Sequence, residues 1–263
     1  MRWLASLLGA LLLCGCAALP RPGSMAPSDT AASTGAQAAT PPYEAWARVL
    51  DRFVDAQGRV DFAGVARDPA DLERFVAYVF DVGPRTHPGS FPTADDVLAY
   101  HLNAYNALAM YKVVAEGIPH TLGGLRKLTF FYFSKVQVAG QAISLYEYEN
   151  KVIRPLGDAR VHVALNCMSV GCPRLPRTPF LPHTLQVQLD REARTFYNES
   201  RNVAVDPEAR VLRLSEILDF YRGDFLAQAP SLAAYVNRYR VERVPEDYAV
   251  QFIPYDWTVF RQP

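Results

Sequence analysis

Apolar residues at intervals of three and four predict helices along most of the chain. Residues 43–55 carry Trp46, Val49, Leu50 and Phe53 in this spacing, which places them on one face of a helix. The same pattern, together with capping residues such as Asp68, Thr93, Ser144, Ser215 and Ser231, predicts helices over residues 69–79, 93–116, 144–153 and 184–198 and after positions 215 and 231.

Short runs of β-branched and aromatic residues predict extended segments between the helices. These are residues 60–62, 130–138, 160–165, 203–205, 211–214 and 249–260, with a hairpin turn at residues 139–140. The helices and strands do not follow a regular βαβ order. We therefore expect a single α+β domain in which helices pack on a small mixed or antiparallel sheet.

The first sixteen residues have the pattern of a secretory signal. Arg2 is followed by an uncharged run up to Cys16, which is shorter than the roughly 20 apolar residues of a membrane-spanning helix. Leu13-Cys14-Gly15-Cys16 resembles the lipobox of bacterial lipoproteins, and this resemblance implies cleavage before Cys16 and a lipid on that cysteine. Because Ala17 follows rather than aspartate, the outer membrane is the expected location.

Residues 17–42 are mostly Ala, Pro, Ser, Thr and Gly. Such a segment cannot bury an apolar core, so it is expected to be a tether. The folded domain is then residues 43–263, held at the membrane by the lipid anchor and facing the periplasm. Cys167 and Cys172 are the two cysteines of this domain, and they lie in an oxidising compartment.

Composition and charge narrow the classes of partner. The chain has 27 basic and 27 acidic side chains and no run of five like charges, so we expect no nucleic-acid partner. Hydrophobic residues make up 50% and aromatic residues 12%, which excludes a disordered or collagen-like chain. No nucleotide, phosphate-loop or metal-binding spacing occurs. We therefore predict no cofactor and no metal, and leave the protein partner open.

Two asparagines share one stripe of the predicted helix over residues 93–116, which is otherwise apolar nearly all round. Such a helix is expected to be buried. A buried amide without a partner costs about 1–3 kcal/mol, so Asn103 and Asn106 either form a structural hydrogen-bond node or line a polar site. Tyr105, between them, is a candidate for contact with a substrate.

A second group of reactive residues lies at positions 160–173. His162 and Cys167 are the components of a thiol nucleophile and its base. In a strand they fall on opposite faces, so they meet only if the strand ends or bulges near Asn166. A Cys167–Cys172 disulfide is one alternative. A zinc site from the two thiolates and a histidine is another, although its spacing matches no recognised zinc motif.

Several of these motifs resemble the signatures of the domain of unknown function 547 family. The resembling segments are residues 99–107, 144–149, 162–173, Trp46 with residues 60–62, and residues 255–257. The resemblance covers almost all of residues 43–263, and Gly171 stands where the family commonly has serine. It implies no assigned activity. A buried polar helix followed by a strand with a histidine is also the order of parts in papain-like and transglutaminase-like folds, an analogy of fold alone.

The leading functional hypothesis is a lipid-anchored envelope protein with a thiol-dependent site that hydrolyses or transfers an amide or thioester. Cys167 is then the nucleophile and His162 the base, and Asn103 or Asn106 orients the histidine or polarises a carbonyl. The candidate substrate contacts are Tyr105, Asn166 and Ser169. The alternative hypothesis is a non-catalytic binding or scaffolding lipoprotein in which Cys167 and Cys172 form a disulfide.

Overall fold

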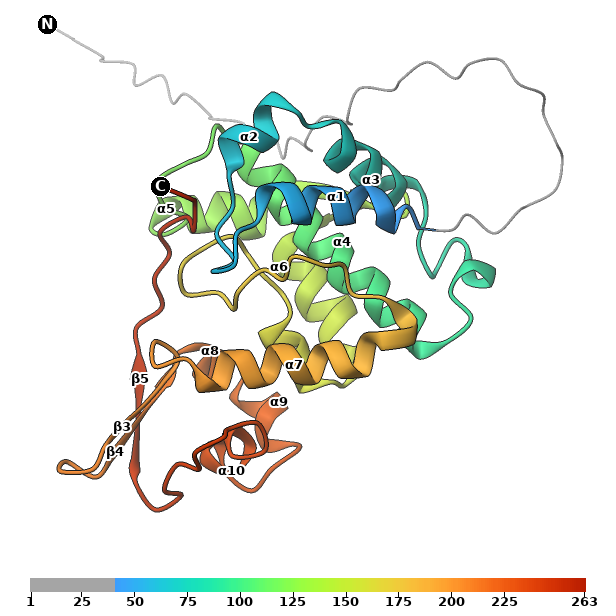
Figure 1. The fold of residues 1–263 in the computed structure, drawn as a ribbon. Coiled ribbons are helices and arrows are strands. Elements are labelled where there is room, and N and C mark those ends of the chain that lie inside the picture. Colours follow the sequence, from blue (N-terminus) through green and yellow to red (C-terminus); the bar gives the residue numbers. More distant parts are fainter. Residues whose placement is uncertain (1–40) are drawn as a thin grey trace, which may run out of the picture.

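The computed structural model describes residues 41–263, and their fold is the predicted mixture of helices and small sheets. The predicted signal segment, the lipidation site at Cys16 and nearly all of the predicted tether lie outside the described residues. The N-terminal part contains four helices, shown in blue to green in Figure 1: α1 (Tyr43–Phe53), α2 (Phe62–Arg67), α3 (Ala70–Asp81) and α4 (Ala94–Ala115).

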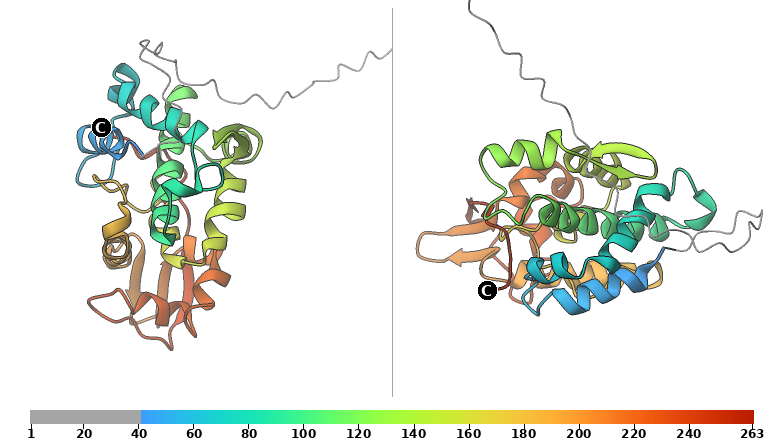
Figure 2. Two further views of the ribbon diagram at one scale, coloured as in Figure 1. Left: turned by 90° about the vertical axis from the view of Figure 1, so that its right-hand side faces the viewer. Right: turned by 90° about the horizontal axis from the view of Figure 1, so that it is seen from above.

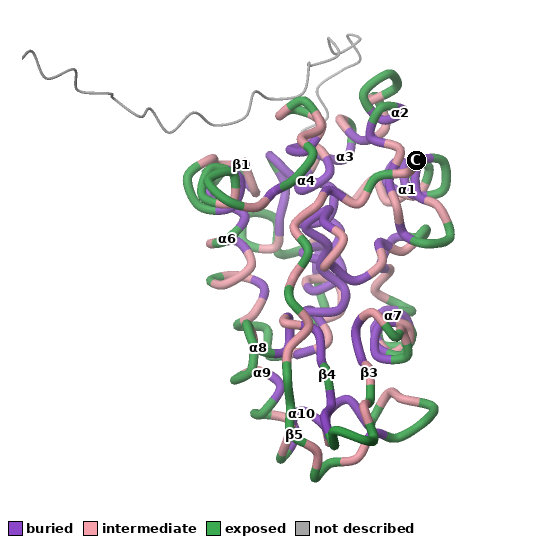
Figure 3. The backbone as a smooth tube through the Cα atoms, turned by 90° about the vertical axis from the view of Figure 1, so that its left-hand side faces the viewer, coloured by how far each residue is buried: buried purple, intermediate pink, exposed green. Residues whose placement is uncertain are grey.

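The long helix α4 passes through the middle of the molecule and is buried along most of its length (Figure 3). It begins at the predicted residue: Thr93 Oγ1 accepts a hydrogen bond from the amide of Asp96, and the amide of Thr93 donates back to the Asp96 carboxylate. Seen from above in Figure 2, α4 lies between α1–α3 on one side and the segment over residues 125–156 on the other.

The N-terminal helices differ from the prediction at their caps. Phe62 does not continue an extended segment but begins α2, because the Asp61 carboxylate accepts a hydrogen bond from the amide of Gly64 at 2.8 Å. Of the predicted extended segment over residues 60–62, Val60 alone pairs as a strand residue, in isolated bridges to Val54 and Arg261. Asp68 follows α2 instead of capping α3, which begins at Ala70.

The middle of the chain consists of short helical elements on either side of one β-hairpin. The elements are α5 (Leu125–Lys127), the π-helix η2 (Leu128–Phe133), strands β1 (Lys135–Val138) and β2 (Gln141–Ser144), α6 (Leu145–Glu147), the π-helix η3 (Tyr148–Ile153), η4 (Arg154–Leu156) and η5 (Ala159–Val163). The predicted strand over residues 130–138 is thus only half right. Phe130 and Phe131 are both buried, which does not fit a strand with one face exposed to solvent.

The predicted strand over residues 160–165 is wrong. Residues Ala159–Val163 form the 3-10 helix η5, which Asp158 begins by accepting a hydrogen bond from the amide of Arg160 at 2.9 Å. The last three residues of η5, Val161, His162 and Val163, are all buried, and η5 packs against α7. The analogy with papain-like folds needed a histidine on a strand, and it loses that element here.

The C-terminal part forms a second layer around a three-stranded sheet, shown in orange and red in Figure 1. Strand β4 (Val211–Ser215) is central, antiparallel to β3 (Val203–Asp206) and parallel to β5 (Ala249–Ile253). The helical elements around it are η6 (Pro182–Thr184), α7 (Leu185–Asn198), α8 (Ile217–Phe220), α9 (Arg222–Leu226) and α10 (Leu232–Val236). Ser231 caps α10 as predicted. The residue at the N-cap of α8 is Glu216 rather than the predicted Ser215.

The last ten residues return from the sheet to the helical part and join the two layers (Figure 1). Val259 bridges to Ser169, Thr258 to Thr121 and Arg261 to Val60. Tyr255, at the start of this return, packs against the apolar cores of both layers. In the described part of the chain, none of the helices has both the length and the apolarity needed to cross a membrane.

Candidate functional site

A pocket of about 330 Å³ lies where the helical layer meets the C-terminal layer. Its wall combines aromatic, ionisable and thiol side chains from segments far apart in the sequence. Tyr105, His162, Cys167 and Cys172 are the residues singled out from the sequence that line it. The pocket is large enough for a small substrate or for one end of a larger one.

The two cysteines of the domain lie side by side on the pocket wall as free thiols. Their sulfur atoms are 2.8 Å apart, longer than the about 2.05 Å of a disulfide bond. The expected Cys167–Cys172 disulfide is therefore not formed in this structure. A tight turn brings them together: Met168 has a positive φ of 72°, and its amide donates to the side chain of Asn166 at 2.6 Å.

The sulfur of Cys172 lies within reach of several hydrogen-bond donors. The amide nitrogen of Cys167 is 2.9 Å away, the hydroxyl of Tyr255 3.0 Å and the hydroxyl of Ser169 3.6 Å. Burial opposes ionisation of this thiol, but hydrogen bonds from Cys167, Tyr255 and Ser169 outweigh it and lower the pKa of Cys172. Burial and the neighbouring Cys172 raise the pKa of Cys167 well above its ordinary value. The geometry thus favours a Cys172 thiolate that accepts hydrogen bonds, with Cys167 as one of the hydrogen-bond donors.

His162 contacts a carboxylate rather than a cysteine. Its Nε2 lies 2.8 Å from Asp224, and its ring stacks on Tyr221 with centroids 3.9 Å apart. A carboxylate only accepts hydrogen bonds, so Nε2 carries the proton and Nδ1, buried and without a partner among the described residues, is the free acceptor. Burial lowers the pKa of His162 to about 4, so the ring is neutral at pH 7.

The predicted pairing of Cys167 with His162 is not formed: no hydrogen bond joins His162 to either cysteine within residues 41–263. The physical reason is the 3-10 turn η5, which directs His162 to Asp224 on α9. Arg154 completes this contact, donating to both Asp224 oxygens at 2.8 and 2.9 Å. Hydrogen bonding by Arg154 lowers the pKa of Asp224, which stays ionised.

Glu149, on η3, is an acidic residue of the pocket wall that the sequence reasoning did not select. Its carboxylate accepts a hydrogen bond from the hydroxyl of Tyr105 at 3.3 Å and also interacts with Tyr221. Burial raises the pKa of Glu149, and the nearby Cys172 adds to this effect. A carboxyl group with a raised pKa beside an ionisable thiol is suited to general acid–base catalysis.

Asn103, one of the two asparagines predicted to orient the histidine or polarise a carbonyl, has a structural role instead. Asn103 accepts hydrogen bonds from the Trp46 indole at 3.2 Å and from the amide of Phe180 at 3.0 Å, and it donates to the carbonyls of Ala99 and Phe180. Its amide is thereby fully bonded, and it does not line the pocket. Of the two roles open to this residue, the geometry supports the structural node.

Asn106 and Asn166 fix the backbone that carries the cysteines. Asn106 accepts from the amide of Asn166 at 2.8 Å and donates to the carbonyl of Ala164 at 3.1 Å. Asn166 donates to the carbonyl of Pro173 at 2.7 Å, across the turn. Neither lines the pocket. Ser169 is likewise buried, and its hydroxyl contacts the sulfur of Cys167 at 3.1 Å and Tyr255 at 3.0 Å rather than the pocket interior.

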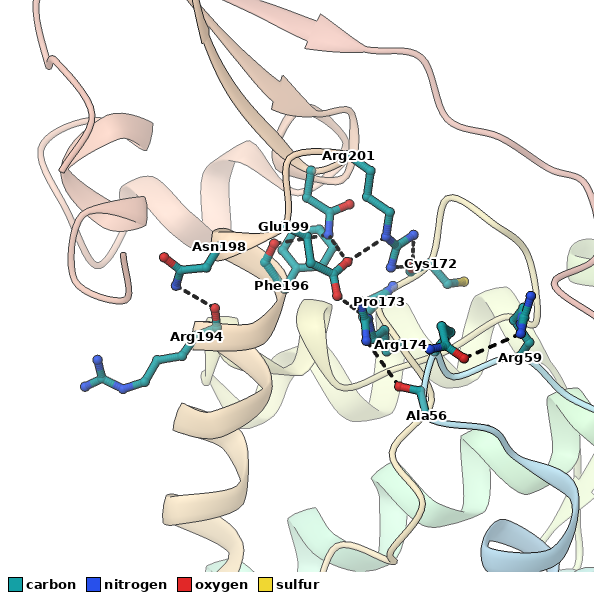
Figure 4. A network of polar contacts seen from close by, with 12 residues as sticks. Ala56, Arg59, Cys172, Pro173, Arg174, Arg194, Phe196, Asn198, Glu199 and Arg201 are labelled. Carbon is teal, nitrogen blue, oxygen red and sulfur yellow. Dashed lines mark hydrogen bonds and ion pairs between the residues drawn. The ribbon is translucent and has the colours of Figure 1, made fainter. Parts of the chain in front are cut away.

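An ionic network outside the pocket holds the same turn from the other side (Figure 4). Arg201 donates to the carbonyl of Val170 at 2.6 Å and to that of Cys172 at 3.3 Å. Glu199 pairs with Arg201 at 2.6 Å and also with Arg174, whose guanidinium donates to the carbonyl of Ala56. The network connects the end of α7 and the loop after α1 to the backbone of Cys172.

The sequence reasoning missed five residues that complete the site: Arg154, Glu149, Tyr221, Asp224 and Tyr255. Glu149 and Tyr255 lie in motifs that resemble the signatures of the domain of unknown function 547 family, but these motifs assign no chemical role to either residue. Tyr221 and Asp224 lie in short helical turns without a recognisable pattern. No group of three or more His, Cys, Asp or Glu side chains in residues 41–263 is arranged to hold a metal ion.

Residues 90–197 match the family described as "Protein of unknown function, DUF547". This segment contains Glu149, His162 and both cysteines, while Tyr221, Asp224 and Tyr255 follow it in the sequence. Comparisons with curated proteins and with solved structures gave no match. The central segment, which carries α4 and the cysteine turn, is thus the part of the chain that matches the DUF547 family.

Proposed function

We propose that the chain is a thiol-dependent hydrolase or transferase that acts on an amide or thioester, with Cys172 as the nucleophile. One observation carries this proposal: the sulfur of Cys172 lies on the pocket wall within 3.0 Å of the Cys167 amide and the Tyr255 hydroxyl. Donors at these distances stabilise a thiolate. Cys172 replaces Cys167 in the role expected from the sequence because its sulfur accepts a hydrogen bond from a backbone amide, in addition to the Tyr255 contact that both sulfurs make.

In the proposed reaction, the Cys172 thiolate attacks the carbonyl carbon of the substrate and forms a carbon–sulfur bond. The bond from that carbon to the leaving amine or thiol then breaks, and the Glu149 carboxyl group supplies the proton that the leaving group needs. In the second step Glu149 accepts a proton from water, which attacks the acyl carbon and restores the thiolate. An amine or alcohol in place of water gives transfer instead of hydrolysis.

The other polar residues of the wall have positioning roles in this scheme. Tyr105 holds Glu149 through its hydroxyl, and Tyr221 stacks on His162. The neutral His162 and the Arg154–Asp224 pair fix that side of the pocket. His162 is not assigned as the base for the thiol, because within residues 41–263 no hydrogen bond joins it to either cysteine.

The proposed location follows from the sequence of the N-terminal segment. Signal cleavage before Cys16 and lipid attachment there would hold the domain at the periplasmic side of the outer membrane, on the tether of residues 17–42. Mass spectrometry of the protein from membranes tests this: a mature chain that begins at a diacylated Cys16 supports it, and an unmodified N-terminus contradicts it.

The test of the activity is trapping of an acyl adduct. The purified chain is mixed with a panel of short acyl thioesters and peptide amides, and the modified residue is identified by mass. We expect an adduct on Cys172 that is absent in Cys172→Ala and forms more slowly in Cys167→Ala, with thermal unfolding confirming that both variants fold. If no substrate gives an adduct while ligands still bind, the chain is a non-catalytic binding protein.

A second candidate function is thiol–disulfide exchange, which the 2.8 Å contact between the two sulfurs favours. Cys172 would attack a substrate disulfide and release one thiol. Cys167 would then attack the mixed disulfide, releasing the second thiol and leaving a Cys167–Cys172 disulfide. Cys167→Ala separates the two functions, because it abolishes this exchange but leaves acyl transfer to Cys172 detectable.

A further inference from the structure

Large apolar side chains are exposed together on the helical segment formed by α5 and η2 and on the neighbouring α6. They are Leu125, Leu128, Tyr132, Phe133 and Tyr146, which we call the apolar face. Leu125 is 85% exposed and Phe133 54%. Single exposed apolar residues are common on proteins, but a group of five on adjoining elements indicates a contact surface.

The apolar face adjoins the pocket. Tyr132 and Tyr146 belong to both, and their rings stack with centroids 4.4 Å apart. Lys127, on the same helical segment, lines the pocket and places its ammonium group 4.2 Å from the ring centroid of Trp257. A surface that covers the apolar face would therefore lie next to the entrance of the site.

Basic side chains exceed acidic ones around the apolar face. Arg126 pairs with Glu116 at 3.7 Å, and Glu147 pairs with both Lys135 and Lys151, at 2.5 and 2.9 Å. Lys127 forms no ion pair with a carboxylate of the described residues and instead contacts aromatic rings. With Lys112, which also pairs with Glu116, and Glu149 of the pocket wall, five basic and three acidic residues leave a local excess of two positive charges.

We propose that the apolar face binds the surface of an anionic phospholipid bilayer, which places the pocket entrance at the membrane. Leucine and aromatic side chains insert at the level of the lipid headgroups, and nearby lysine and arginine side chains attract anionic headgroups. Both components lie within residues 125–151. This interaction is independent of the proposed thiol chemistry.

The test uses residues 16–263 with Cys16→Ser, which lacks both the apolar signal segment and the lipid attachment site, and vesicles of phosphatidylglycerol with phosphatidylethanolamine. Hydrogen exchange of residues 125–133 is followed by mass spectrometry with and without vesicles, and binding is measured by co-sedimentation. The double variant Leu125→Ser/Phe133→Ser is compared with a matched control, Val187→Ser/Val241→Ser, whose two valines are 75% and 88% exposed outside the apolar face.

We expect vesicles to slow exchange in residues 125–133, and the apolar-face variant to bind at least about tenfold more weakly than the control. Neutral phosphatidylcholine vesicles should bind the parent more weakly than anionic ones. Equal binding by the two double variants overturns the proposal. Protection of residues 125–133 that depends on protein concentration and not on vesicles also overturns it, because a second copy of the chain would then cover the face.

Discussion

The backbone amide of Cys167 donates a hydrogen bond to the sulfur of Cys172 at 2.9 Å. Because this donor belongs to the backbone of the turn, it is present whenever the turn is folded. It makes the two thiols of the pair chemically different, although both are buried and both lie near the Tyr255 hydroxyl. The following predictions test this difference and the groups that surround it.

Replacing Tyr255 with phenylalanine tests the side-chain donor. Tyr255→Phe keeps the ring that packs against Trp257 and Phe220 but removes the hydroxyl within 3.2 Å of both sulfurs. We expect the pKa of Cys172 to rise and its alkylation at pH 7 to slow by about tenfold. Thermal unfolding should change little. An unchanged alkylation rate would show that the hydroxyl does not stabilise the thiolate.

Replacing Arg201 tests whether the ionic network of Figure 4 holds the cysteine turn. Arg201→Gln removes the donors to the carbonyls of Val170 and Cys172 and leaves Glu199 with one ion-pair partner fewer. We expect unfolding to become easier by about 1–3 kcal/mol and hydrogen exchange of residues 167–172 to increase. The exposed Arg194 is the matched control. Equal effects of Arg194→Gln and Arg201→Gln would contradict the positioning role.

Glu149 should make the protein less stable as the pH rises. Burial raises the folded-state pKa of Glu149 above its ordinary 4.5, so its contribution to stability is fully present below pH 4.5 and is lost as the pH rises through the folded-state pKa. Glu149→Gln keeps the shape and removes the titration. Urea unfolding at pH 5 and pH 8 should show that the variant gains stability relative to the parent at the higher pH. An equal difference at both values would contradict the raised pKa.

His162 should act in the opposite direction. Its folded-state pKa of about 4 lies below its ordinary 6.5, so its contribution is present above pH 6.5 and is lost as the pH falls toward 4. In His162→Gln, which retains a donor for Asp224, the loss of unfolding free energy between pH 7 and pH 5 should shrink by on the order of 1–2 kcal/mol. An acid sensitivity identical to that of the parent would show that His162 is not held neutral.

Local chemistry made some elements predictable from the sequence. The capping residues Thr93 and Ser144 begin α4 and α6 as expected, since each bonds to residues three positions away. The strands β3 and β4 follow from their turn. Residues 160–165 were misread because Val161 and Val163 alternate with polar residues, as in a strand, whereas packing against α7 enforces a 3-10 helix. Burial by distant elements decided this case, and no local pattern reports it.

The site was predictable to the extent that it is local. Cys167 and Cys172 are five positions apart, so their proximity follows from one turn. Glu149 joins them through the packing of η3 on α4, Tyr221 comes from the second layer, and Tyr255 comes from the return of the chain from that layer. The spacing of residues in one sequence carries no information about that topology. The asparagines of α4 were correctly expected to be buried, and their hydrogen bonds to backbone groups settle which of their two roles the geometry supports.

The central claim, that Cys172 is the ionised and reactive thiol, is tested most directly by the pH dependence of alkylation. The folded chain is treated with iodoacetamide from pH 5 to pH 9, and the modified cysteine is identified by mass at each pH. We predict that Cys172 reacts first and that its rate reaches half of its maximum well below the ordinary thiol pKa of about 8.5. Faster reaction at Cys167, or reaction of Cys172 only at or above pH 8.5, would contradict the account.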